Sequence, residues 1–468
     1  MGLSIIPAPF LTRYESKKIQ SFLLKSSQER KLTALNEYLM HLRARHLSGE
    51  TGGIIAICST HRMVLEAAID RAATEGDVLL VEATSNQVNQ FGGYTGMRPS
   101  EFTDYIQSLA AAAGFPATHL IIGADHLGPH PWKKMPAAQA MKRATVLVKD
   151  CVKAGFNKIH LDTGMSCADD PKTPLPLNII VERSTMLCLA AESQARRQPA
   201  DRPLPVYVIG AEVPMPGGGL EDSSQLTVTS AEEVAHLLET TRACFLREGL
   251  MSAWERVVAV VVQPGVDFGN TQVARYRPKL AAELSSYHAV LPGMMTYEVH
   301  ATDYQPPRAI KQLIMDHFTI LKVGPCLTNA YREAVYALAL IEMEWLGGKK
   351  GAILSGIRRT LESAMESQPE HWQTHYRGSA TQVDFMRQYS YLDRIRYYWH
   401  SPEVVDAMRC LLSNLNRPIP HVLLRQYFPD IYPAIETGEI DPTALSLIKW
   451  RIRRTLTPFN RACRHSAA

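Results

Sequence analysis

The chain has 468 residues, of which 46% are hydrophobic and 21% charged, a balance typical of a globular protein with a large buried core. Its formal net charge is +4, and basic and acidic residues are mixed along most of the sequence, which argues against a nucleic-acid partner. No stretch approaches the roughly 20 consecutive apolar residues that a membrane-spanning helix needs, which argues against a membrane protein.

The ends and the cysteines bear on the compartment. The N-terminal stretch MGLSIIPAPFLTRYESKK has two prolines and lacks the basic start of a signal peptide, so we expect an ordered arm or tail. The eight cysteines are scattered and form no CxxC pair. Both features favour a cytoplasmic protein.

Short runs rich in Val, Ile and Leu alternate with longer helical patterns. The predicted strands are residues 54–58, 78–82, 120–124, 158–162, 206–212, 257–263, 294–300 and 319–323. Their apolar character is typical of parallel strands that are buried on both faces. Helical patterns such as 136–155 and 230–249 lie between them and end in glycine, a common helix stop.

This order of elements predicts an α/β fold, a (β/α)8 TIM barrel over residues 51–345. A doubly wound sheet is the alternative, but it would usually carry a glycine-rich turn after the first strand, where this chain has CSTHR. Residues 1–50 are predicted to form an N-terminal arm whose helix, at 29–47, caps the barrel floor. Residues 346–468 are predicted to form a C-terminal helical subdomain, packed on the barrel or on another subunit, which leaves a homo-oligomer open.

Polar residues end most of the predicted strands. They are Ser59, Glu82, Asp125 with His126, Asp162, Glu212, Gln263, Glu298 with His300, and Lys322. In TIM barrels the active site lies at the C-terminal ends of the strands, and a charged group there must be solvated, paired or bound to a metal. The sequence therefore predicts a site at this rim.

A divalent metal is one interpretation of this rim. His126, Glu212 and His300 come from three strands and Asp162 from a fourth, and such a set suits Zn²⁺, Mn²⁺ or a similar ion. Only the barrel brings these residues together, so a hydrogen-bonded polar rim without metal remains the alternative.

The segment 321–333 leaves the eighth strand and enters a helix. Barrel enzymes often bind phosphate at such a helix N-terminus. We therefore predict a phosphate site near Gly324 and Thr328, with Lys322 or Arg332 adding positive charge.

Several motifs resemble those of the tagatose-bisphosphate aldolase Z-subunit family. They are EATSNQVNQFGGYTGM (82–97), IGADHLGP (122–129), NKIHLDTGMSCADD (157–170), IGAEVPMPGG (209–218), VQPGVDF (262–268), YEVHATDYQ (297–305) and ILKVGPCLT (320–328). The resemblance spans about residues 35–345, and the tail is less recognisable. The family was long described as a chaperone-like partner of a class II aldolase, and some members are assigned as metal-dependent D-tagatose 6-phosphate 4-epimerases.

The resemblance implies three functions to weigh. The first is a 4-epimerase that interconverts D-tagatose 6-phosphate and D-fructose 6-phosphate, or the free sugars. The second is a non-catalytic subunit of a class II D-tagatose-1,6-bisphosphate aldolase, and the third is a self-sufficient aldolase. Enolisation cannot invert C4 of a 2-ketohexose, so an epimerase needs either transient oxidation by NAD or retro-aldol cleavage of C3–C4. The chain has no dinucleotide fingerprint, so we expect a divalent ion and no NAD.

The same resemblance suggests roles for individual residues. As in class II aldolases, His126 would bind the metal and Asp125 would move the proton. Glu82 or Glu298 would be a second acid/base or would orient a ligand. Side-chain amides would bind the two positions of the C4 hydroxyl, or would only structure their loops; these are Asn86, Gln87, Asn89 and Gln263.

Overall fold

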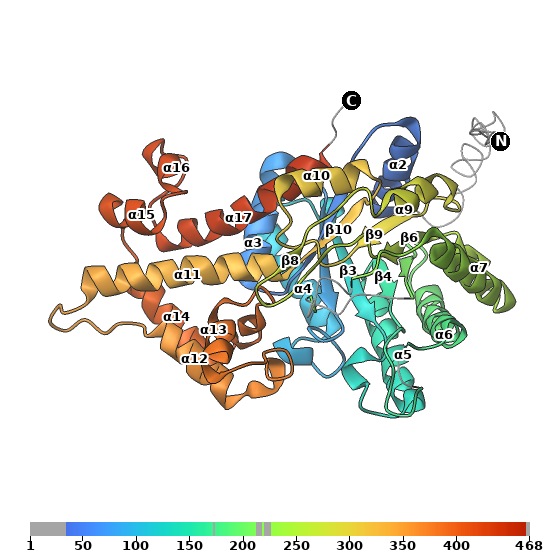
Figure 1. The fold of residues 1–468 in the computed structure, drawn as a ribbon, viewed down its shortest axis with the longest axis horizontal. Helices are drawn as coiled ribbons and strands as arrows, with labels where there is room; N and C mark the ends of the chain where they lie inside the picture. The colour runs from blue at the N-terminus through green and yellow to red at the C-terminus, as the bar shows by residue number, and fades with distance from the viewer. Residues whose placement is uncertain (1–33, 172–173, 212–217, 220–225, 465–468) are drawn as a thin grey trace, which may run out of the picture.

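Eight parallel strands close into a barrel in the computed structural model, which describes residues 34–171, 174–211, 218–219 and 226–464 (Figure 1). Around the barrel the order is β1 (Ile54–Cys58), β10 (Ile320–Val323), β9 (Thr296–Val299), β6 (Val257–Val262), β5 (Val206–Ile209), β4 (Lys158–Leu161), β3 (Leu120–Leu127) and β2 (Leu79–Thr84). The predicted TIM barrel is confirmed. Strand β3 continues three residues beyond its predicted end, whereas β5 ends before residue 210.

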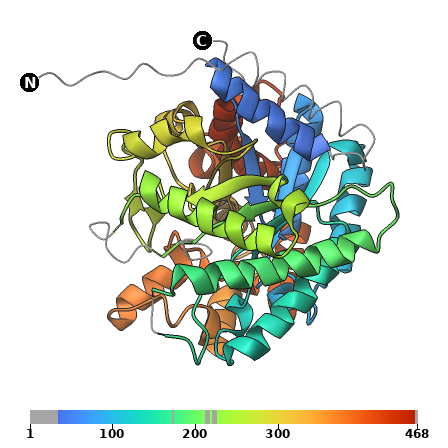
Figure 2. The ribbon, with the colours of Figure 1, turned by 90° about the vertical axis from the view of Figure 1, so that its right-hand side faces the viewer.

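Helices surround the barrel (Figure 2). They are α3 (Arg62–Glu75), α4 (Pro99–Ala112), α5 (Ala137–Ala154), α6 (Leu177–Arg196), α7 (Ala231–Arg247), α8 (Met251–Trp254), α9 (Ala282–Tyr287), α10 (Pro307–Met315) and α11 (Pro325–Leu346). Local chemistry sets their ends: Ser230 and Glu233 form a capping box at the start of α7, and Gly155 ends α5 in the left-handed conformation. A small two-stranded sheet, β7 (Asp267–Phe268) with β8 (Val273–Ala274), was not predicted.

Helix α2 (Ala34–Ser48) covers the N-terminal end of the barrel. Its Leu39 and Leu42 are buried against strand residues inside the barrel, among them Ile54 and Ile320. Arg43 donates from its guanidinium to the carbonyl of Leu291, at 3.2 Å. The helix therefore closes the floor of the barrel and leaves the opposite end for a site.

The C-terminal segment folds back onto its own barrel. Its helices are α12 (Ile357–Ser367), α13 (Ala380–Tyr389), α14 (Pro402–Asn414), α15 (His421–Tyr427), α16 (Tyr432–Glu436) and α17 (Ala444–Cys463). In Figure 1, α17 runs back beside α3 and α10. Lys449 on α17 pairs with Asp70 on α3 at 3.0 Å, and the Gly53 N–H donates to the carbonyl of Cys463. The domain boundaries at residues 50 and 345 stay predictions.

The described part of the chain contains no helix that is both long and apolar enough to cross a membrane.

Candidate functional site

The last residues of β3 are the starting point of the site. The register between β3 and β4 shifts between Ala124 and Leu127, and His126 adopts a left-handed backbone with φ of 50°. A regular strand would send Asp125 and His126 to opposite faces. The irregularity instead lets both side chains reach the same buried cluster, where His126 Nε2 lies 3.6 Å from Asp125 Oδ2.

Two glycines, Gly123 in β3 and Gly128 directly after it, make room for this arrangement. A β-carbon on Gly123 would lie 2.7 Å from the Glu82 carboxylate inside the barrel. A β-carbon on Gly128 would lie 1.6 Å from the carbonyl oxygen of Asp162, a distance that no side chain can occupy. Gly123 therefore leaves room for the Glu82 side chain, and Gly128 permits close approach of the backbone of Asp162.

Four buried side chains bring potential metal ligands together. Ligand atoms of Asp125, His126, His160 and His300 all lie within 4.8 Å of one another. His160, on β4, was missed because it lies inside its strand. The spacing of Lys158, His160 and Asp162 at every second position held the missing signal, since such residues share one face of a strand.

Carboxylates orient the histidines of this cluster. His126 Nδ1 lies 2.7 Å from Asp162 Oδ2, and His300 Nε2 lies 2.9 Å from Glu298 Oε1. Burial alone would raise the pKa of Asp162, but the hydrogen bond with His126 lowers it to about 2. His160 Nε2 is buried without a hydrogen-bond partner among the described residues. Imidazoles held by carboxylates, with one nitrogen left for a ligand bond, fit a divalent metal.

This geometry changes the expected ligand set. Asp162 is hydrogen-bonded to Nδ1 of His126 and therefore orients that ring. The carboxylate of Asp162 is not part of the four-residue cluster. Glu212 lies outside the described residues. Its role as a ligand therefore stays a prediction. His160, which the sequence analysis did not name, lies in the cluster with His126 and His300.

Beneath the histidines lies a network of buried ions. Lys158 Nζ lies 2.5 Å from Glu82 and 2.7 Å from Glu298. Lys322 Nζ contacts Glu82 and lies 2.5 Å from Asp125 Oδ1. Burial alone would lower the pKa of both lysines, but the carboxylates raise it. Burial would likewise raise the pKa of Asp125 and Glu298, but nearby charged groups hold it well below its usual range.

The network constrains three of the predicted roles. Glu82 and Glu298 do not line the pocket described below, and both are ion-paired with Lys158. Glu298 also orients His300, one of the two functions expected for it. Lys322 does line the pocket, but its ammonium is already engaged by carboxylates, so it offers little free charge to a phosphate.

Lys158 is expected to be essential to stability. The Lys158→Met substitution should lower the free energy of unfolding by about 3–5 kcal/mol, because it removes a partner from two buried carboxylates. Denaturant unfolding measures the loss. The control is Lys153→Met, at an exposed position of α5, which should stay within about 0.5 kcal/mol of the wild type. Equal stability of Lys158→Met and the control would contradict the role of Lys158.

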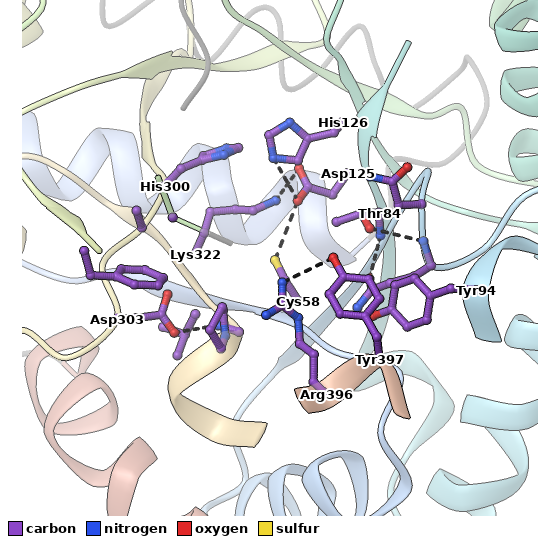
Figure 3. A pocket seen from close by; sticks show the side chains of 18 residues that line it. Cys58, Thr84, Tyr94, Asp125, His126, His300, Asp303, Lys322, Arg396 and Tyr397 are labelled. Carbon is purple, nitrogen blue, oxygen red and sulfur yellow. Dashed lines mark hydrogen bonds and ion pairs between the residues drawn. The ribbon is translucent and has the colours of Figure 1, made fainter. Parts of the chain in front are cut away.

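A pocket of about 610 Å³ opens above the cluster (Figure 3). Its lining includes Cys58, Thr84, Asn86, Gln87, Tyr94, Asp125, His126, Gly218, Phe268, His300, Asp303, Lys322, Gly324, Arg396 and Tyr397. In Figure 3, His126 and His300 lie on one side of Cys58, and Arg396 and Tyr397 lie on the other. The last two come from the C-terminal segment, which the sequence did not connect with the site.

Two of the four predicted amides do not reach this pocket. The side chain of Asn89 donates to the carbonyl of Ser85 and accepts from the N–H of Phe91, both at 2.9 Å. Gln263 Oε1 accepts from two backbone N–H groups of its own loop. Asn89 and Gln263 therefore structure their own loops, which was the alternative that the sequence left open for these amides. Asn86 and Gln87 line the pocket.

Carboxylates of the chain itself occupy part of the predicted phosphate site. The N–H groups of Gly324 and Cys326, at the start of α11, donate to Asp303 Oδ1 at 3.0 and 2.8 Å. The hydroxyl of Thr328 donates to Asp393 at 2.5 Å. The carboxylate of Asp303 thus takes two N–H groups at the positive end of the helix, where the sequence predicted a phosphate. A second cavity adjoins the pocket at this end of the barrel, and Ser59 and Thr328 line it. Arg332 lines neither of the two cavities.

The similarity of this chain to known proteins covers the barrel and the C-terminal helices. Residues 39–464 match the family described as D-tagatose-1,6-bisphosphate aldolase subunit GatZ/KbaZ-like. The chain is 40% identical to a probable tagatose 6 phosphate kinase from Sinorhizobium meliloti 1021, with a TM-score of 0.80 over 88% of this chain and 100% of that chain. A fructose-bisphosphate aldolase (Fba) from Campylobacter jejuni is 12% identical over 82% of this chain and 94% of its own, with a TM-score of 0.41.

Proposed function

The chain belongs to the D-tagatose-1,6-bisphosphate aldolase subunit GatZ/KbaZ-like family, and from that premise we propose that its barrel is a metal-dependent 4-epimerase of ketohexose phosphates. It would interconvert D-tagatose 6-phosphate and D-fructose 6-phosphate. The family match extends through the helical tail, which the sequence motifs left less recognisable. The name of the Sinorhizobium meliloti relative also points to tagatose 6-phosphate as the class of ligand.

The observation that carries the proposal is the buried group of Asp125, His126, His160 and His300. Burying ionisable groups is costly, and a subunit that only stabilises another protein gains nothing from such a group beneath a pocket. The donors fit Zn²⁺, Mn²⁺ or a similar ion, held by His126, His160 and His300. Such an ion, when bound, supplies Lewis-acid polarisation of the C2 carbonyl and the neighbouring hydroxyl of the sugar.

The residues of the chain perform the proton transfers. Asp125 accepts the proton of the C4 hydroxyl while the C3–C4 bond breaks, and the electrons of that bond pass to the ketone-bearing fragment as an enolate. The aldehyde fragment turns, the enolate adds to its opposite face, and Asp125 returns the proton to the C4 oxygen. Lys322, at 2.5 Å from Asp125, balances the charge of the carboxylate before it takes the proton and after it returns it.

The side-chain amides of Asn86 and Gln87 suit the two positions of the C4 hydroxyl. Gln87 Oε1 accepts from the N–H of Thr84 at 2.8 Å, which fixes the amide at the wall of the pocket. No NAD is required by this route, because carbon–carbon cleavage and re-addition change no net oxidation state.

The decisive assay incubates the purified protein alone with D-tagatose 6-phosphate and a divalent metal. We expect conversion to D-fructose 6-phosphate, and loss of conversion after chelation. Coupling to glyceraldehyde-3-phosphate dehydrogenase should also detect slow leakage of the cleaved aldehyde.

Other outcomes favour other functions. No conversion with any divalent metal, together with co-purification of a smaller class II aldolase, would make the chain a non-catalytic subunit. Net triose phosphate from the bisphosphate would make it an aldolase. Tightly bound NAD in an active preparation would contradict the retro-aldol route.

A further inference from the structure

The C-terminal segment supplies one wall of the pocket, and its position is fixed by a buried turn. Asp393 adopts a left-handed backbone with φ of 48°, and its carboxylate accepts a hydrogen bond from the hydroxyl of Thr328 on α11. The short helix η7 (Arg394–Tyr398) begins directly after this turn. Arg396 and Tyr397 therefore face the pocket from a segment that is anchored to the barrel.

Arg396 has donors to spare. Its guanidinium donates to the carbonyls of Leu392 and Asp393, and its second amino group lies 3.4 Å from the hydroxyl of Tyr397. Among the described residues no carboxylate forms an ion pair with it, unlike the buried Lys322. A guanidinium that faces a pocket without a counter-ion is a ready partner for an anion.

A second chamber of about 800 Å³ adjoins the pocket at Arg396. The two cavities share Cys58, Gln87, Tyr94, Gly324 and Arg396 in their linings. The second chamber is lined by Arg396 and by hydroxyl groups, among them those of Ser59, Thr60 and Thr95, and no described carboxylate lines it. Arg62, which also lines it, is paired with Glu66 at 2.7 Å. The first pocket, by contrast, contains Asp125 and Asp303. A phosphate dianion is therefore better accommodated in the second chamber than in the first pocket, beside the histidine cluster.

From this arrangement we infer that Arg396 anchors the phosphate of the substrate in the second chamber, so that the site selects ketohexose 6-phosphates over free ketohexoses. The inference rests on the proposed function for the placement of the sugar: C2 to C4 lie at the histidine cluster, and C6 points toward Arg396. It also explains how the cleaved fragment stays in place. The phosphate belongs to the aldehyde half, so an anchored phosphate lets that half turn about its own bonds without leaving.

Binding measurements test the inference independently of turnover. Titration calorimetry compares D-tagatose 6-phosphate with D-tagatose on metal-loaded wild type, Arg396→Gln and Arg396→Lys. We expect Arg396→Gln to weaken binding of the phosphorylated sugar by roughly 10- to 100-fold, toward that of the free sugar, since charged hydrogen bonds are lost. Arg396→Lys should fall in between, because it keeps the charge but loses the planar fork.

Arg409→Gln is the matched control. Arg409 is an exposed residue of α14 that pairs with Asp406, and its substitution should change neither affinity. Thermal unfolding of each variant shows whether it is folded. If Arg396→Gln does not fold, Arg396→Lys decides: affinity for the phosphorylated sugar equal to wild type overturns the inference, and a selective loss supports it.

Further outcomes are equally direct. Equal affinity of the wild type for both sugars, or equal loss of both in Arg396→Gln, overturns the inference. In active protein, Arg396→Gln should also release a larger share of glyceraldehyde 3-phosphate per turnover, and an unchanged share would count against anchoring. If phosphate selectivity depends on Arg396 but no epimerisation occurs, the proposed function fails and the phosphate site stands.

Discussion

Replacing Asp125 with asparagine is expected to lower epimerase turnover by about 10²–10⁴-fold, the usual contribution of one positioned acid or base. Asparagine has nearly the shape of aspartate but cannot accept the C4 hydroxyl proton. The barrel should remain folded, because Lys322 keeps its contact with Glu82 when the charge of Asp125 is lost. Steady-state kinetics with D-tagatose 6-phosphate measure the effect.

The carboxylate of Asp125 also lies within reach of the histidine cluster, so Asp125 could carry the proton or bind the metal. The metal content of the variant distinguishes these two roles. Turnover lost with metal affinity retained identifies a proton carrier, and parallel loss of both identifies a ligand. Asp170→Asn is the matched control, because Asp170 pairs with Arg183 and does not line the pocket. Full activity of Asp125→Asn would exclude both roles.

The second large effect is expected on metal binding, when the ion or one of its proposed ligands is removed. Purified protein should contain about one divalent ion per chain, and chelation should abolish activity. Asp162→Asn should weaken metal binding by about 10–100-fold, because Asp162 only orients His126, at 2.7 Å. His160→Ala removes a direct donor and should weaken binding more than Asp162→Asn does.

Calorimetric titration of metal into apoprotein provides these affinities without relying on catalysis. His421→Ala, at an exposed position of α15, controls for the loss of a histidine as such. Unchanged metal affinity in His160→Ala would place the ion elsewhere. A wild-type protein that binds no divalent ion would leave a hydrogen-bonded polar rim, the alternative that the sequence left open.

The sequence contained enough information for the barrel. Eight apolar runs, separated by amphipathic helices, can be buried only as parallel strands covered on both faces, and each of them forms a barrel strand. The same pattern placed Asp125, His126 and His300 at the end of the barrel where they are found. These predictions rest on local periodicity and on a rule for one fold, so no contact between distant residues had to be known.

The proposed ligand set and the proposed phosphate site depended on tertiary structure. His160 lies within a strand, and barrel closure alone places it beside His126 and His300. The start of α11 has the sequence of an anion site, but the fold brings Asp303 to its N–H groups. Asn89 and Gln263 are used by their own loops.

The sequence by itself thus determined the barrel and the rim where its polar strand ends meet, because strand burial is encoded in short-range periodicity. Only the tertiary structure decided which side chains face one another, and in particular that Arg396, from the helical tail, reaches the pocket. The physical reason is that a charged group in a protein interior must be paired with a group of opposite charge or with a hydrogen-bond partner. Each buried carboxylate or cation takes whichever partner the fold brings within hydrogen-bonding distance, and sequence spacing does not specify that partner.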